Sequence, residues 1–133
     1  MTRYMLDTNT VSHLIRDHPA VARRVVSVPM ASLSISAITK GELLFGLAKR
    51  AGATRLHAAV AEFLRRVDVL PWNSDTADHY GSVRANLELQ GKPLAPLDLL
   101  IAAHALNAGT VLVTNDGAFR QVTNLTVEDW TKP

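Results

Sequence analysis

The sequence contains no cysteine. Disulfide bonds and thiolate metal sites are therefore excluded. Any bound metal ion must be held by Asp, Glu or His side chains or by neutral oxygens, and hard oxygen ligands favour magnesium, manganese or calcium. The missing cysteine thus restricts the metal chemistry that this chain can perform.

Long apolar runs are also missing. None approaches the roughly 18 to 20 residues that span a bilayer, and polar residues interrupt the start of the chain before a signal-peptide core could form. The expectation is a cytoplasmic protein with no membrane partner.

Several enzyme signatures are absent as well. There is no Gly-rich phosphate loop and no GxSxG nucleophile elbow. The five histidines are scattered and form no HExxH pair, so a zinc hydrolase is disfavoured. His104 lies in an apolar helical segment, where a packed core histidine is expected.

What is present fits one globular domain. The chain has 133 residues and 47% hydrophobic content, which suits a single core spanning residues 1–133. The net charge is only +2, with fourteen basic and twelve acidic residues. If four acids were neutralised in a metal site, the remaining surface would be mildly basic, as a nucleic-acid partner requires. Charge alone, however, favours ordinary solubility.

Hydrophobic periodicity predicts an α/β fold in which strands alternate with helices. The alternation implies βα units and a central parallel sheet of about five strands flanked by helices. The strands are expected at residues 3–7, 32–36, 69–72, 110–114 and 125–127. The helices are expected at residues 8–17, 19–27, 37–50, 54–67, 74–90 and 96–109, with a turn or short helix at 116–119.

Two aspartates follow apolar runs that read as strands. Asp7 ends the run at residues 4–6, and Asp116 closely follows the run at residues 110–114. In an open parallel sheet, ligands bind beyond the carboxyl ends of the strands, so the two carboxylates are expected to converge. Local structure offers alternatives, because Asp7 could cap the next helix and Asn-Asp-Gly at Asp116 is a turn signal.

Two further acids lie on helices. Glu42 falls on a stripe with Ile38 and Phe45 that is expected to be buried, where an unpaired carboxylate is costly; the alternative is a boundary residue that reaches solvent. Asp98 occupies the first turn of the helix that Pro96 opens. The helix dipole would favour it there by about 0.3 to 1 kcal/mol, but this helix is apolar enough to be buried.

Four carboxylates in one pocket repel each other unless cations neutralise them. Two hard divalent ions about 3.5 to 4 Å apart could do so, and they would clamp the attacking and leaving oxygens of a phosphodiester. The constellation therefore favours metal-dependent phosphodiester hydrolysis.

Taken in order, four segments resemble PIN-domain ribonucleases, and most closely the toxins of VapBC toxin–antitoxin pairs. The resemblance extends over essentially the whole chain, including the closing VEDW. The segments are MLDTN with Asp7, ISAITKGELLFG with Glu42, DLLIAAHAL with Asp98 and LVTNDGAF with Asp116.

The resemblance implies a PIN-like fold and an endoribonuclease that depends on Mg²⁺, with Mn²⁺ as the other choice. It makes Asp7, Glu42, Asp98 and Asp116 the catalytic and metal-binding acids, with hydrolysis to a 5′-phosphate and a 3′-hydroxyl. Some relatives carry asparagine at the position of Asp116. Asn9 and Thr114 match positions that orient the acids by hydrogen bonds.

The resemblance also implies partners. Similar toxins cleave structured RNA, often a tRNA anticodon stem-loop, form dimers or larger toxin–antitoxin assemblies, and bind an antitoxin whose C-terminal segment covers the active site. Trp72 and Trp130 could stack on bases, although packing is expected for both. Candidate RNA-binding cations near the motifs are Lys40, Lys49, Arg50, Lys92 and Arg120.

Two other functions share an aspartate after the first strand. An aspartyl-phosphate phosphatase typically has a second aspartate two residues later, where this chain has Asn9, and its lid domain would not fit in 133 residues. A receiver-like phospho-acceptor module needs an acidic pair at this place and a lysine after a late strand, and neither is found.

Overall fold

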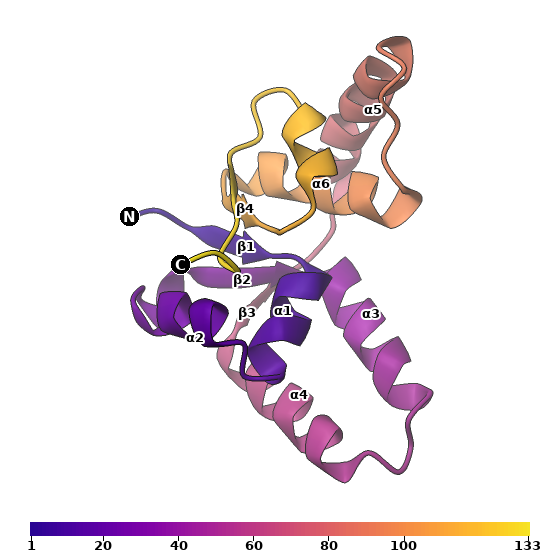
Figure 1. Ribbon diagram of the computed structural model, residues 1–133. Coiled ribbons are helices and arrows are strands. Elements are labelled where there is room, and N and C mark those ends of the chain that lie inside the picture. Colours follow the sequence, from indigo (N-terminus) through magenta and orange to yellow (C-terminus); the bar gives the residue numbers. More distant parts are fainter.

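A computed structural model describes residues 1–133 and contains one five-stranded sheet. All neighbouring strands are parallel, in the order β3-β2-β1-β4-β5, which confirms the predicted α/β architecture (Figure 1). The strands are β1 (Tyr4–Leu6), β2 (Leu33–Ser36), β3 (Asp68–Leu70), β4 (Val111–Val113) and β5 (Val127–Glu128).

Helices cover both faces of this sheet, α5 and α6 on one face and α1 to α4 on the other (Figure 1). None of the α-helices combines the length and hydropathy that crossing a membrane requires. The helices are α1 (Thr8–Ile15), α2 (Pro19–Val26), α3 (Ala37–Ala48), α4 (Thr54–Arg66), α5 (Ser74–Leu89) and α6 (Pro96–Ala108), with 3₁₀ turns η1 (Met30–Ser32) and η2 (Gly117–Gln121).

Strand β1 lies at the centre of the sheet and joins two hydrophobic cores. Successive side chains of a strand point to opposite faces, so Met5 packs in the core beneath α5 and α6, while Leu6 packs against α1 to α4. Leu112 and Val113 of β4 divide in the same way. The backbone N–H of Asp7 donates to the carbonyl of Val113 at 3.1 Å, which fixes the ends of β1 and β4 side by side.

The last strand was predicted at residues 125–127 but is formed by Val127 and Glu128. Its pairing partners in β4 are Leu112 and Val113, while Leu125 packs against the core instead. Glu128 then accepts hydrogen bonds from Arg24 Nη2 and Trp130 Nε1, both at 2.9 Å. The strand therefore begins two residues later than predicted. A three-residue pattern does not show which residues pair with β4 and which pack against the core.

The stripe predicted to be buried around Glu42 is wrong at one position. Phe45 is 63% exposed, and the neighbouring Leu44 is 45% exposed. Helix α3 instead buries Thr39, Leu43 and Leu47, which recur every four residues. Because α3 is apolar on most of its surface, its sequence does not reveal which face the sheet covers.

Gly109 ends α6 in the left-handed conformation, with φ of 67°. We expect Gly109→Ala to lower the free energy of unfolding by about 1 kcal/mol, since an L side chain is strained there. Gly81 is the matched control because it lies within α5 with open space around its Cα. Gly81→Ala should raise the free energy of unfolding by roughly 0.5 to 1 kcal/mol. Urea unfolding measures the change in the free energy of unfolding for both variants. Changes of the same sign in the two variants would contradict this explanation.

Candidate active site

Asp7 follows β1 directly and begins α1. Its Oδ1 accepts the backbone N–H of Thr10 at 2.8 Å, so the helix cap that local sequence suggested is present. Asp7 is also only 6% exposed, and it is the one acidic residue among the buried side chains. This hydrogen bond satisfies only one of the two oxygens of the buried side chain.

The second oxygen of Asp7 is open to a ligand. Oδ2 makes no hydrogen bond. Every fully buried side-chain nitrogen or oxygen in the chain does have a hydrogen-bond partner, so Oδ2 is not one of them. Oδ2 therefore retains contact with the surface, and Asp7 uses one oxygen to hold the backbone while presenting the other.

Glu42 is positioned from α3 by α1. The hydroxyl of Thr8 donates to Oε1 of Glu42 at 3.0 Å, and Thr39 Oγ1 lies 3.5 Å from the same hydroxyl. These contacts join the first turn of α1 to α3, and they leave Oε2 of Glu42 without a hydrogen bond. The residue again has one fixed and one available oxygen.

Asp116 follows β4 and has the turn chemistry expected of Asn-Asp-Gly. Its Oδ1 accepts the backbone N–H of Ala118 at 2.9 Å and caps η2. Its own N–H donates to Oγ1 of Thr114 at 3.0 Å, and Thr114 is buried at the end of the strand. Thr114 therefore fixes the backbone that carries Asp116.

Asp98 lies in the first turn of α6, half-buried, with no hydrogen bond to its carboxylate. Burial raises the pKa of this carboxyl above its usual value, and the negative charges of Asp116, Asp7 and Glu42 raise it further. For all three charges to act on Asp98, the four acids must share one region of the molecule. The structure thus brings together Asp7 and Asp116, which follow β1 and β4, with the acids of α3 and α6 at the carboxyl edge of the sheet.

No basic side chain neutralises this acidic region. None of the four acids forms an ion pair, whereas Asp68, Glu62, Glu88 and Glu128 do so elsewhere. The acids also lie some distance apart. No three acidic or histidine side chains in this arrangement are close enough to hold one metal ion. The donor set is oxygen alone, which fits a hard divalent cation.

Asn9 was predicted to orient the acids, but its side chain is exposed and makes no hydrogen bond. The residues that hold Asp7 and Glu42 are the threonines on either side of it, Thr10 and Thr8. Sequence reasoning missed both. The contact with Asp7 gave no side-chain signal, because its donor is the backbone N–H of Thr10. For Glu42 the available signal was the hydroxyl of Thr8 directly after the helix cap. The role of Asn9 stays a prediction.

His104 is a packed core histidine, as expected. It is 2% exposed, and its Nδ1 lies 2.8 Å from Oγ of Ser36, the residue that caps α3. Burial lowers the pKa of His104, while the carbonyl of Pro71 acts in the opposite direction. A neutral ring thus connects α6 to the ends of β2 and β3.

Both tryptophans pack, as expected. Trp72 Nε1 donates to the carbonyl of Leu100 at 3.0 Å, and Trp130 is 2% exposed against Tyr4. Trp130 is therefore too buried to stack on a free base.

Known proteins share this arrangement. The family model described as PIN domain matches residues 4–125. The tRNA(fMet)-specific endonuclease VapC of Shigella flexneri is 37% identical over 131 residues, covering 98% of this chain and 99% of the relative. Ribonuclease VapC2 of Haemophilus influenzae is 35% identical with the same coverage.

Solved structures agree with the sequence comparison. A chain in the DNA-bound VapBC structure from Salmonella typhimurium superposes with a TM-score of 0.90 at 36% identity, covering 98% of this chain and 99% of that one. A chain in the structure of VapBC2 from Rickettsia felis bound to a promoter DNA fragment superposes with a TM-score of 0.88 at 31% identity, covering 97% of this chain and 99% of that one. These matches confirm the resemblance drawn from the four acidic segments: the chain belongs to the PIN domain family, among the VapC ribonucleases.

Proposed function

We propose that this protein is the toxin of a type II toxin–antitoxin pair and that it hydrolyses RNA phosphodiester bonds with a divalent cation. In this proposal residues 1–133 form a single PIN domain, and Asp7, Glu42, Asp98 and Asp116 hold Mg²⁺ or Mn²⁺. The observation that carries it is the set of four acids from separate parts of the chain, none of which forms an ion pair.

The free oxygens support this assignment. Asp7, Glu42 and Asp116 each use one oxygen in a hydrogen bond that orients the side chain, and Asp98 uses none. A bound divalent ion supplies charge neutralisation and an activated water at neutral pH. The oxygens that these hydrogen bonds leave free would hold the cation.

The chain's own residues account for the other requirements of the reaction. Thr8 and Thr10 hold the carboxylates of Glu42 and Asp7 in place, so little reorganisation is needed when RNA arrives. Hydrolysis would leave a 5′-phosphate and a 3′-hydroxyl.

The relatives support a structured RNA as substrate. Those from Shigella flexneri and Salmonella typhimurium are named tRNA(fMet)-specific endonucleases, and we propose a tRNA anticodon stem-loop here. The VapBC structures support an antitoxin as partner. A homodimer or larger toxin–antitoxin assembly in the cytoplasm completes the proposal.

Asp7→Asn is the sharpest test of catalysis. Asparagine can still cap α1 through its side-chain oxygen, so the substitution removes charge without removing the Thr10 hydrogen bond. We expect RNA cleavage to fall by about a hundredfold or more, the cost of losing a group that stabilises the transition state. Denaturing gels of a cleaved tRNA measure the rate.

The matched control for that experiment is Asp75→Asn, which changes an exposed acid in the first turn of α5. It should cleave like the wild type. Cleavage by the folded Asp7→Asn variant at the wild-type rate, or by the wild type in excess chelator, would show the proposal to be wrong.

Metal binding should be visible without RNA. A cation that binds only the folded protein stabilises it by about 2.7 kcal/mol at a hundred times its Kd. We expect Mg²⁺ or Mn²⁺ to raise the melting temperature of the wild type and of Asp75→Asn, and to have little effect on Asp7→Asn. Potassium chloride at equal ionic strength is the salt control. An equal rise in all three proteins would contradict a site at these acids.

Asp98→Asn should stabilise the metal-free protein at neutral pH. When folding raises the pKa of a carboxyl, the protein loses stability as the pH rises above the usual pKa of that group, here 3.8. Asparagine removes that penalty, so the melting temperature in chelator should exceed that of the wild type at pH 8. The difference should shrink as the pH falls toward 3.8, because protonation of Asp98 removes the repelled charge. A variant less stable than the wild type at pH 8 would mean that the helix dipole outweighs the repulsion.

A further inference from the structure

A cleft of about 200 Å³ lies between α1, α3 and α4, beside the candidate active site. Thr8 and Glu42, which belong to that site, line it. Along α3 the cleft continues to Lys49 and Arg50, and Arg16 at the end of α1 also borders it. The acidic region therefore opens into a channel bordered by three cations.

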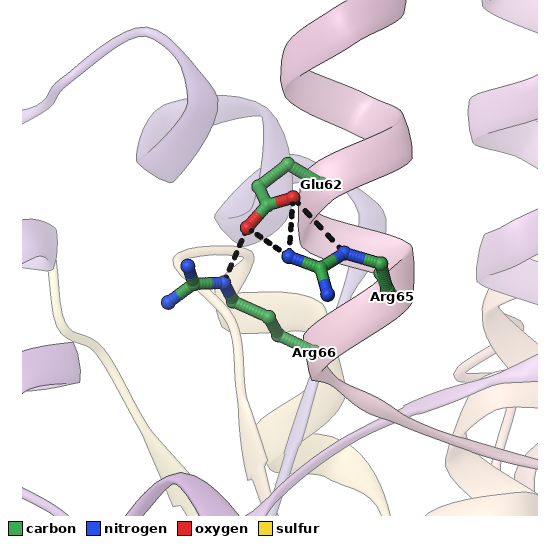
Figure 2. A network of polar contacts seen from close by, with 3 residues as sticks. All are labelled: Glu62, Arg65 and Arg66. Carbon is green, nitrogen blue, oxygen red and sulfur yellow. Dashed lines mark hydrogen bonds and ion pairs between the residues drawn. The ribbon is translucent and has the colours of Figure 1, made fainter.

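These three cations have no acidic partner, whereas five arginines elsewhere on the surface do. Arg65 and Arg66 on α4 both bind Glu62 (Figure 2), and the other paired arginines are Arg3, Arg24 and Arg84. None of the five salt bridges involves a residue of the cleft. The positive charge at the cleft is thus free to act on a ligand.

Lys49 is held in place by an aromatic ring. Its Nζ lies 4.6 Å from the centre of the Phe45 ring, one turn earlier on α3. This contact orients the ammonium without neutralising it, because a ring carries only a quadrupole. It also gives a local role to a phenylalanine that is 63% exposed.

We propose that the cleft binds the RNA strand beside the scissile bond, with Arg16, Lys49 and Arg50 contacting backbone phosphates. The inference rests on the proposed nuclease function and assigns part of its substrate site. Four clustered carboxylates repel a polyanion, so a nuclease of this kind needs positive charge close to them. The apolar floor, which includes Leu43, Leu47 and Leu56, offers a surface for riboses and bases.

The spacing separates binding from chemistry. Lys49 caps the end of α3, seven residues beyond Glu42. At 1.5 Å per residue, the two residues are about 10 Å apart along the helix axis. The cations therefore contact phosphates of neighbouring nucleotides while the acids act on the scissile one. Removing them should raise KM and leave kcat nearly unchanged.

The structure also sharpens the earlier choice of RNA-binding cations. Lys49 and Arg50 were expected near the motifs, whereas Arg16 was not considered, because α1 and the end of α3 are distant in sequence. Lys40, Lys92 and Arg120 do not line this cleft. All three remain exposed, which makes them useful as unaltered background charge in a binding experiment.

The experiment compares two triple variants that each remove three positive charges. The cleft variant is Arg16→Gln, Lys49→Gln and Arg50→Gln, and the control variant is Arg65→Gln, Arg66→Gln and Arg84→Gln. Each is made in the Asp7→Asn background for binding and in the wild type for kinetics. The probe is a fluorescent single-stranded RNA, titrated between 50 and 200 mM NaCl, with circular dichroism to verify folding.

The cleft variant should bind RNA more weakly, and its slope of log K against log salt should fall by about 2, since each single-strand phosphate contact contributes about 0.7. Its KM for cleavage should rise with kcat nearly constant. The control variant should keep the wild-type slope and KM. Equal slopes in the two variants would overturn the assignment.

Polyglutamate serves as a second probe, since a cationic cleft with an apolar floor could also hold an acidic polypeptide. If the cleft variant loses polyglutamate binding but keeps its RNA slope, the cleft belongs to a protein partner and the proposal is wrong. If the wild type cleaves no RNA with metal, the nuclease function itself has failed. Metal-dependent cleavage with an unaffected cleft variant would overturn only the present inference.

Discussion

Repulsion between carboxylates is the constraint on which this structure depends. Asp7 is buried, and Asp98 is half-buried under the influence of Asp116, Asp7 and Glu42. A fold driven by stability alone would place basic groups among them or replace them with neutral ones. The chain instead keeps them without basic partners, and hydroxyl or backbone donors fix one oxygen each of Asp7, Glu42 and Asp116. In the function that we propose, a bound cation would relieve this repulsion and so link folding stability to the reaction.

The parallel sheet explains why four acids so distant in sequence can meet. The central position of β1 places Asp7 between the ends of β2 and β4, and the segments that follow those strands carry Glu42 and Asp116. Helix α6 begins at the same edge and brings Asp98. Strands that run in one direction deliver their carboxyl ends to one edge, so the topology itself gathers the charge.

Much of this was accessible from the sequence, for identifiable reasons. The apolar runs before Asp7 and Asp116 marked two strands, and the helix that starts at Pro96 was apolar enough to be recognised as buried. The exposed face of α3 was not, because Phe45 and Leu44 are as hydrophobic as the residues that pack. The hydrogen bond from Thr8 to Glu42 joins residues 34 positions apart. Such contacts depend on how two helices meet, which local pattern does not specify. Arg16 escaped attention for the same reason.

The order of the acids along the chain has a consequence for synthesis. Asp7 emerges from the ribosome first, but β1 needs β4 as a neighbour, and Asp116 lies beyond β4. An incomplete nascent polypeptide therefore lacks both the companion strand and the final carboxylate of the group. The catalytic centre that we propose can assemble only when translation is nearly finished, so prematurely terminated fragments would carry the early motifs without the ability to cut RNA.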